Sequence, residues 1–194
     1  MKTREDAQKL LNEWVIQDSL RSHCLGVAVC MEAYAKKFKE EGQDIDVDMW
    51  YITGLLHDFD WERFPSIEEH PIKGCQELKN QGYNEGIIES ILGHNPATGI
   101  PRRNTMAKTL FAVDELSGLV TALAKVRPGN FSGMSARSVK KAMKKKDFAA
   151  AINREDIKIG MEELSLESDD EKNEHFELVI KALSESKEEL GFDN

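Results

Sequence analysis

Apolar residues recur along this chain at spacings of three and four, which places them on one face of an α-helix. The first such set lies near the N-terminus and consists of Ala7, Leu10, Leu11, Trp14 and Val15. Longer sets of the same kind predict helices from Asp18 or Ser19 to about Lys39, from Asp46 or Asp48 through Leu56, and from about Asn104 to Lys125.

Between these helices the chain carries signals for helix ends. The run Ser66-Ile67-Glu68-Glu69 has the form of a capping box. It predicts a helix with Pro71 in its first turn and His70 extended just ahead of it. A further helix is built by Ile87, Ile88, Ile91 and Leu92, and is closed by Gly93 and the turn-like Asn95-Pro96.

The last third of the chain opens with a Pro- and Gly-containing break over residues 127–133. Short helices are predicted over about 136–143, 148–152 and 154–164, and a last helix has Phe176, Val179, Ile180 and Leu183 on one face. Strand alternation and internal repeats are both missing, so the fold class is all-α. At 194 residues the chain fits one domain: a helical core over 1–126 and a C-terminal helical extension over 127–194 packed on it.

Composition narrows the class of protein. Hydrophobic content of 40% and charged content of 31% are typical of a soluble globular protein, and no apolar run approaches the ~20 residues that span a bilayer. The N-terminus turns acidic at once and shows no signal-peptide core. The three cysteines have no CxxC spacing, which favours reduced thiols in a cytoplasmic protein without a membrane segment.

The net charge of −9 is unevenly distributed. Residues 155–194 hold fourteen acidic and four basic residues, whereas residues 125–146 hold eight basic residues and no acid. The basic ones are Lys125, Arg127, Arg137, Lys140, Lys141, Lys144, Lys145 and Lys146. This run either meets an anionic substrate or partner, or is a solvated face toward the acidic segment. No aromatic interleaving accompanies it, which argues against nucleic acid.

The dipeptide His57-Asp58 carries the strongest chemical signal, because it ends the apolar run of residues 52–56. A histidine and a carboxylate at the end of a buried helix are costly to desolvate, and metal coordination commonly offsets that cost. At a helix C-terminus both side chains can lean toward one cation. Further residues of ligand type surround the pair in the sequence: His23, His70, His94 and Asp114.

Two of these residues lie inside predicted helices. Asp114 has poor helix propensity and apolar neighbours, so it is expected to be buried and to need a partner, whereas Glu115 beside it points elsewhere, as a surface or supporting group. His23 has the small neighbours Cys24 and Ala28, which would let another helix approach closely.

The residue types limit the metal. Imidazole nitrogens with carboxylate oxygens suit Fe, Mn, Zn, Ni or Co, whereas Ca and Mg prefer oxygen ligands. No thiolate pair is present to form a structural zinc site. His175, in the acidic segment, is interpreted as a hydrogen-bonded core residue or a surface residue, the usual fate of a single histidine.

The order His23, His57-Asp58, Asp114 resembles the HD superfamily of metal-dependent phosphohydrolases, with Leu55-Leu56-His57-Asp58 as its motif. The intervening His70 and His94 resemble the subgroup that binds two metals. The stretch 94–118 is similar to HD-type diadenosine tetraphosphate hydrolases, and the chain as a whole to uncharacterised bacterial HDIG-like proteins. One departure is Phe59-Asp60, which stands where HDIG proteins have Ile-Gly.

The resemblance implies an HD-domain helical bundle with extra C-terminal helices. It implies a first divalent metal held by His23, His57, Asp58 and Asp114. Asp58 would bridge to a second metal on His70 and His94. Fe or Mn is favoured, with Zn, Ni, Co or Mg possible. His57 and Asp58 would be the catalytic pair, and a metal-activated hydroxide would cleave a phosphate ester or anhydride of a nucleotide or small metabolite.

Several roles stay open at this level. The acid for the leaving group could be Asp60, Glu62 or Glu69, each of which could equally support a ligand or lie on the surface. Arg102, Arg103 and Lys108 would bind outer phosphates or form a solvated helix start. Arg127 would lie ~20 Å along the helix from Asp114, too far for contact with the reacting phosphate unless the chain folds back. The alternative function is a non-catalytic metal-stabilised module that binds a nucleotide or protein partner through residues 125–146. The oligomeric state is undetermined.

Overall fold

The computed structural model describes residues 2–192, and within this range the chain forms helices without a strand. The helices are α1 (Arg4–Trp14), α2 (Asp18–Glu40), α3 (Val47–Leu56), α4 (Ile72–Asn80), α5 (Glu85–His94), α6 (Thr105–Lys125), α7 (Ala136–Met143), α8 (Arg154–Glu163) and α9 (Asp169–Glu185), with a 3-10 turn η1 (Pro96–Thr98) after α5. The all-α prediction is confirmed.

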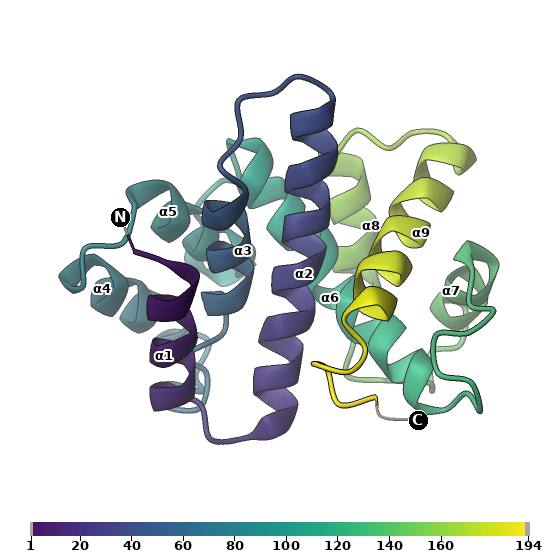
Figure 1. Cartoon of the computed structure of the whole chain (residues 1–194), viewed down its shortest axis with the longest axis horizontal. Helices are drawn as coiled ribbons and strands as arrows, with labels where there is room; N and C mark the ends of the chain where they lie inside the picture. The colour runs from purple at the N-terminus through teal and green to yellow at the C-terminus, as the bar shows by residue number, and fades with distance from the viewer. Residues whose placement is uncertain (1, 193–194) are drawn as a thin grey trace.

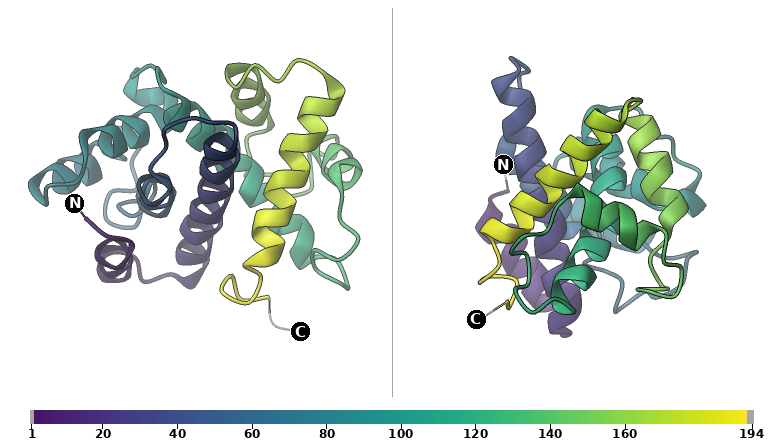
Figure 2. Two further views of the ribbon diagram at one scale, coloured as in Figure 1. Left: turned by 45° about the horizontal axis from the view of Figure 1, so that its top comes forward. Right: turned by 90° about the vertical axis from the view of Figure 1, so that its right-hand side faces the viewer.

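Three helices form the centre of the molecule. The long α2 packs against α3 and α6, and these three carry most of the fully buried side chains. Figure 1 shows α1, α4 and α5 on one side of this centre and α7, α8 and α9 on the other. In both views of Figure 2, α9 runs beside α2, with which it is in contact.

Small residues allow α2 and α3 to approach closely. A Cβ atom placed on Gly54 would lie 2.8 Å from the Cα of Ala28, closer than real Cβ contacts. The two backbones are therefore nearly in contact at this point, as the small residues after His23 predicted. Gly160 of α8 has the same role against Ala112 of α6, where a Cβ would lie 2.5 Å from Cα.

Most predicted helix ends lie within a residue or two of the observed ones. Asp46 caps α3 by accepting hydrogen bonds from two backbone N–H groups. α2 begins at Asp18, but its N-cap is Gln17, which makes no side-chain capping bond, rather than Asp18 or Ser19. The start of α4 also differs: Pro71, after a cis peptide bond, is the N-cap rather than a residue of the first turn, and His70 lies in a run of turns rather than in an extended segment.

One predicted helix is wrong. Residues 148–152 form successive turns, and Ala149 has a left-handed backbone with φ of 46°. The guanidinium of Arg154 donates to the carbonyls of Phe148, Ala149 and Ile152. The carbonyls of Phe148 and Ile152 are therefore satisfied by a side chain instead of by helical N–H groups, and the carbonyl of Ala149 also accepts the backbone N–H of Ile152.

The C-terminal segment packs on the centre chiefly through α8 and α9, and α7 also contacts α6. α8 lies on α6, and α9 contacts both α2 and α6. His175 of α9 is 2% exposed and is hydrogen-bonded to the hydroxyl of Tyr34 on α2, so the core alternative predicted for this histidine is confirmed. The division of the chain at residue 126 stays a prediction.

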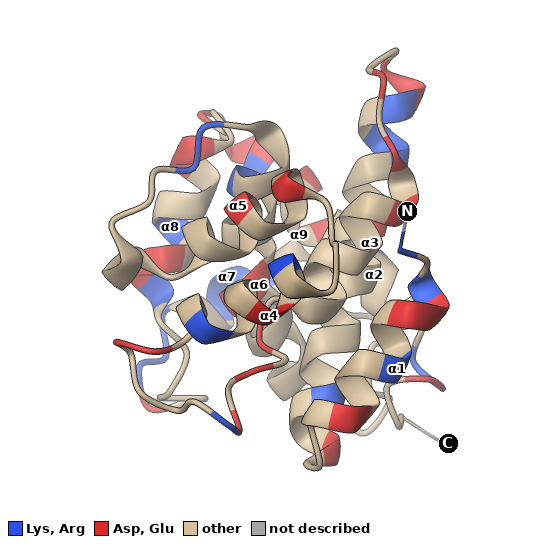
Figure 3. Cartoon of the chain, turned by 90° about the vertical axis from the view of Figure 1, so that its left-hand side faces the viewer, with Lys and Arg blue, Asp and Glu red and all other residues tan. Residues whose placement is uncertain are grey.

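The three cysteines are free and buried. From the side of α4 and α5, basic and acidic residues are interspersed along α1 and α2 (Figure 3). No helix within residues 2–192 combines the length and the apolar character that crossing a bilayer requires.

Candidate metal centre

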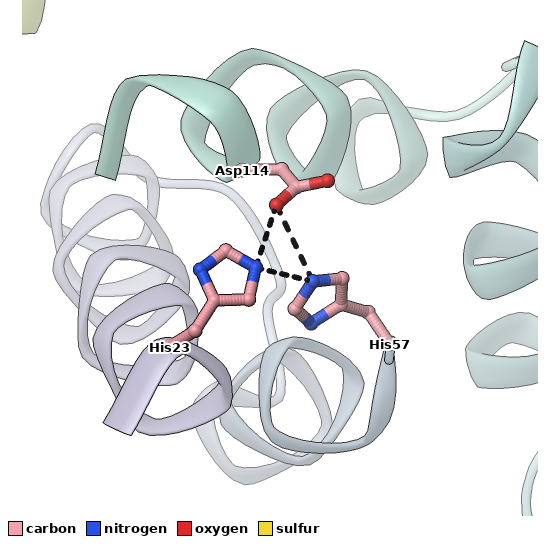
Figure 4. A group of neighbouring side chains, drawn as sticks. All are labelled: His23, His57 and Asp114. Atoms are coloured by element: carbon pink, nitrogen blue, oxygen red, sulfur yellow. Dashed lines mark hydrogen bonds and ion pairs between the residues drawn. The ribbon is translucent and has the colours of Figure 1, made fainter. Parts of the chain in front are cut away.

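The three central helices position a first group of ligands (Figure 4). His23 comes from α2, His57 follows the last residue of α3, and Asp114 lies in α6. The Nε2 atoms of His23 and His57 are 3.2 Å apart, and they lie 3.1 and 3.3 Å from Asp114 Oδ1. Three atoms able to bind a cation therefore converge on one point.

A second group consists of Asp58, His70 and His94. His70 lies in the turns ahead of α4, and His94 is the last residue of α5. Their Nε2 atoms are 3.3 Å apart, and each lies 3.2 Å from Asp58 Oδ1. Segments separated by up to 36 residues thus meet at one carboxylate oxygen.

Asp58 lies between the two groups. Its Oδ1 faces His70 and His94, whereas its Oδ2 is 3.5 Å from His57 Nε2 and 3.7 Å from His23 Nε2. A carboxylate placed in this way can contribute one oxygen to a cation in each group. The six residues predicted as metal ligands are all brought together.

Hydrogen bonds at the outer nitrogens determine the tautomers of three histidines. The Nδ1 of His57 lies 2.8 Å from the carbonyl of Gly54, and that of His94 lies 2.5 Å from the carbonyl of Ile91. A carbonyl only accepts, so Nδ1 carries the proton, and a neutral ring then has a lone pair on Nε2. The Nδ1 of His70 donates likewise to Asp60 Oδ1.

The facing nitrogens therefore do not hydrogen-bond to one another as neutral rings. The Nε2 atoms of His70 and His94 point lone pairs at each other across 3.3 Å, which is repulsive unless a positive charge lies between them. Ligands bound ~2.1 Å from a transition metal are about 3.0–3.4 Å apart at octahedral or tetrahedral angles. The separations within both groups, 3.1 to 3.3 Å, match this range, so the residues fit one cation per group.

The protein's own charges favour a cation here. Burial lowers the pKa of His57, but Asp58 and Asp114 outweigh it and raise that pKa to about 9. The pKa of His70 also rises to about 9, because Asp58 and Asp60 outweigh burial. The pKa values of Asp58 and Asp114 are lowered in spite of burial, chiefly by His57. Positive charge is thus strongly attracted to the centre.

The three candidates for a leaving-group acid have different places. Asp60 is fully buried, accepts from Nδ1 of His70 and from the backbone N–H of Gly74, and so orients a ligand. Glu62 accepts hydrogen bonds from the backbone N–H groups between α1 and α2. Glu69 accepts a hydrogen bond from the hydroxyl of Ser66. None of these contacts places a carboxyl group between the two ligand groups.

Asp114 and Glu115 differ in part from expectation. Asp114 has the predicted partners, but its side chain is 19% exposed rather than buried. Glu115 points elsewhere, as predicted, and accepts the backbone N–H of Asn153 ahead of α8. Burial and the charge of Asp114 raise the pKa of Glu115 to about 7.

Of the predicted phosphate ligands, Arg102 is held by other groups. Its guanidinium makes two hydrogen bonds to the carboxylate of Glu163, donates to the carbonyl of Gly93, and lies 3.7 Å from the centre of the Phe111 ring. It therefore joins the start of α6 to α8.

Arg103 is exposed and Lys108 is half-buried. Neither makes an ion pair with another residue in the described part of the chain. A role for Arg102, Arg103 or Lys108 in binding substrate stays a prediction.

The centre is open on one side. His57, His70 and His94 are buried, whereas 27% of the His23 side chain and 19% of that of Asp58 are exposed. Trp61 is 41% exposed, and its ring stands edge-on to His70 at 4.9 Å between centroids. Sequence reasoning missed this residue; its position three residues after Asp58 was the only signal.

Comparison of the sequence with known proteins shows which family has this arrangement of residues. Residues 20–119, about half of the chain and the range that contains all six ligands, match the HD domain. The chain belongs to the HD-domain family. HD-domain proteins are in general metal-dependent phosphohydrolases that bind divalent cations, and the donor set of this centre fits that chemistry.

The chain is also similar to an uncharacterized protein of Methanocaldococcus jannaschii, with 32% identity over 70 residues. The match covers 36% of this chain and 41% of the relative, so the chain spans less than half the length of that protein. No solved structure matches the chain.

Proposed function

We propose that this HD-domain protein is a dinuclear phosphohydrolase that cleaves a phosphate ester or anhydride of a nucleotide or small phosphorylated metabolite. The observation that carries the proposal is the position of Asp58, with one carboxylate oxygen toward each of two ligand groups. A site for a single structural cation would need only one group. Fe or Mn suits the mixed nitrogen and oxygen donors, and Zn, Ni, Co or Mg is compatible with them.

The charges of the ligands favour an anionic substrate. Four of the six ligands are histidines, so only Asp58 and Asp114 contribute negative charge to the set. Two carboxylates under-neutralise a pair of divalent cations, and the positive charge left over attracts phosphate. When bound, such a pair supplies Lewis acidity toward phosphate oxygens and lowers the pKa of water toward neutral pH.

The residues hold this centre ready for an incoming phosphate. The carbonyls of Gly54 and Ile91 and the carboxylate of Asp60 orient three imidazoles before substrate arrives. The buried rings exclude water from the inner side of the centre. The exposed edges of His23 and Asp58 lie on the outer side, from which a phosphate group would enter for in-line attack.

Trp61 supports a substrate that carries a ring. Its indole is partly exposed and contacts the ring of His70, which belongs to the second group of ligands. A base stacked on an aromatic side chain gains about 1–3 kcal/mol. We expect Trp61→Ala to raise KM for a nucleotide substrate about tenfold or more with little change in kcat, and Trp61→Phe to recover most of that loss.

The test combines metal content with turnover. Protein purified without chelator or histidine tag is measured by elemental analysis and then assayed for phosphate release from nucleotides, dinucleoside polyphosphates and phosphomonoesters. We expect two metal equivalents per chain, and activity that Asp58→Asn and His57→Gln abolish while circular dichroism is unchanged. The control is Glu68→Gln, which alters an exposed carboxylate outside the ligand set.

Each outcome decides something definite. Full activity in both ligand variants would contradict the proposal, as would absence of metal after reconstitution. Bound metal without turnover on any substrate, together with a large fall in Tm on chelation, would favour the alternative of a non-catalytic module that binds a nucleotide or protein partner.

A further inference from the structure

A groove of about 650 Å³ lies at the far end of α6, away from the metal centre. Its walls come from the end of α6, from α7 and from the segment that follows α7. The lining residues are Leu123, Val126, Arg127, Ser135, Arg137, Ser138, Lys141, Ala142, Lys145 and Phe148. Four of these ten side chains are cationic and none is acidic, so the groove concentrates positive charge on a chain whose net charge is −9.

Most of this charge is not neutralised by the acidic C-terminal segment. Lys140, which does not line the groove, pairs with Asp169 of α9 at 3.5 Å. Within residues 2–192, none of Arg137, Lys141 and Lys145 forms an ion pair. A solvated face paired with the acidic segment therefore accounts for only part of the basic run.

Arg127 is held in place at the groove wall. Its guanidinium donates to the carbonyls of Asn130 and Ser132 at 3.2 and 2.9 Å. These neutral acceptors leave its positive charge uncompensated. An oriented guanidinium loses little freedom on binding a phosphate.

The groove also has apolar walls, which a purely solvated basic face would not need. Val126 is 67% exposed and Phe148 is half-buried, and both line the groove together with Leu123. Cationic groups beside exposed apolar surface suit a ligand with phosphate at one end and a flat, weakly polar ring at the other.

The dimensions favour a small molecule over a long polyanion. A volume of about 650 Å³ lies in the usual range of sites for small ligands. Two carboxylates lie beside the groove, the exposed Asp147 next to Phe148 and Asp169 near Lys140. A nucleic acid running past the groove would meet these carboxylates.

The groove is remote from the metal centre. Leu123 and Val126 follow Asp114 on α6 by nine and twelve residues, which is about 14 and 18 Å at the helical rise. Figure 1 places α7 on the side of the molecule opposite α4 and α5, near which His70 and His94 lie. A ligand in the groove would not place its phosphate among the six metal ligands.

We propose that this groove is a second, non-catalytic binding site for a small phosphorylated ligand of the nucleotide class. Arg127, Arg137, Lys141 and Lys145 bind its phosphates, and Val126 and Phe148 contact its ring. The proposal goes beyond the phosphohydrolase function and does not depend on it, since nothing in the groove belongs to the metal centre.

The test uses ADP as the probe in the presence of EDTA, so that hydrolysis cannot occur. Binding to the full chain is measured by calorimetry and located by amide chemical shifts. We expect saturable binding with shifts at Ser135, Ser138 and Phe148, about tenfold weaker binding for adenosine or pyrophosphate alone, and no shifts around His23. No saturable binding, or shifts confined to the metal centre, would overturn the proposal.

Two charge-matched variants separate the groove from diffuse attraction. Lys141→Gln with Lys145→Gln removes two groove cations, and Lys144→Gln with Lys146→Gln removes two exposed cations outside it. We expect the first to weaken ADP binding about tenfold or more and the second to leave it within about twofold. Equal losses in both would show attraction by net charge alone and would contradict a site.

The Asp58→Asn variant distinguishes this proposal from the proposed function. If ADP binding is unchanged in a variant that has lost turnover, the groove is a separate site. If Asp58→Asn abolishes ADP binding, the ligand sits at the metal centre and the groove proposal fails. A single-stranded RNA that binds more tightly than ADP and displaces it would overturn the assignment to a small ligand.

Discussion

The buried carboxylate of Asp60 orients the imidazole of His70, with 2.7 Å between Oδ1 and Nδ1. Its second oxygen accepts the backbone N–H of Gly74 in α4 at 2.8 Å. The bond to His70 keeps Nε2 directed at Asp58 and so determines the geometry of the second ligand group. Asp60 is the residue that stands in place of the HDIG glycine, so the departure from that motif adds support for a ligand.

The first prediction concerns this support. Asp60→Asn removes the charge that stabilises the His70 proton, and we expect about 10–100-fold weaker binding of one of the two metal equivalents. Titration of metal-free protein with Mn²⁺ measures this directly. Glu68→Gln, an exposed neighbour with the same change in charge, should bind both equivalents normally. Unaltered affinity in Asp60→Asn would show that His70 does not hold a metal.

The second prediction concerns the contact that brings His23 and His57 together. In Gly54→Ala the new Cβ would lie 2.8 Å from Ala28 Cα and 2.9 Å from the carbonyl of Val27. Backbone atoms cannot yield as side chains do, so α2 and α3 must separate. We expect the free energy of unfolding to fall by about 1–3 kcal/mol or more, in spite of the better helix propensity of alanine.

Gly26→Ala in α2 is the matched control, because the nearest atom to its Cβ is a flexible Leu183 methyl at 3.3 Å. Urea denaturation of both variants gives the comparison. Equal stability of Gly54→Ala and the wild type would contradict the close approach of the two helices.

Much of the fold is predictable because helix periodicity is local. The bounds of α6 and α7 follow from apolar spacing and turn residues. The grouping of His23, His57 and Asp114 could be predicted because polar side chains among apolar neighbours need a partner. Residues 148–152 could not be predicted in the same way. Three of their carbonyls accept hydrogen bonds from Arg154. The pattern of hydrophobic residues does not reveal a contact of this kind.

Within the site, the sequence predicts ligand types better than their supports. The carboxyl groups of Asp60, Glu62 and Glu69 are chemically alike and all lie near ligands in the chain. Only the folded chain separates them, since one bonds to His70 and another to the N–H groups between α1 and α2. Exposure of Trp61 beside His70 depends on the same tertiary arrangement.

The third prediction concerns metal removal and pH. In metal-free protein the pKa values of His57 and His70 rise to about 9 from 6.5. Protonation of the folded state then contributes stability that is fully present below pH 6.5 and is lost as pH rises toward 9. Metal competes with these protons. The increase in Tm that Mn²⁺ produces should therefore be larger at about pH 8 than at about pH 6.

Melting curves with EDTA or with excess Mn²⁺ at the two pH values provide the measurement. The double variant His57→Gln and His70→Gln is the control and should show little response to Mn²⁺ at either pH. A metal-induced shift that is the same at both pH values would contradict competition between metal and protons at these histidines.

The last prediction concerns His175, far along the chain from the HD motif. Burial lowers its pKa to about 4 from 6.5, so between these values the unfolded chain binds a proton that the folded chain does not. The neutral, buried His175 costs the folded state nothing above pH 6.5. As pH falls from 6.5 toward 4, the free energy of unfolding decreases by up to about 3 kcal/mol. His175→Gln keeps a polar partner for Tyr34 and removes the titration.

The variant and the wild type are compared at each pH by urea denaturation. The variant should be least stable relative to wild type near neutral pH, and the difference in the free energy of unfolding should narrow steadily on acidification. The acidic groups of the metal centre titrate equally in both proteins and cancel in the comparison. A gap independent of pH would mean that His175 is not held neutral by its place between α9 and α2.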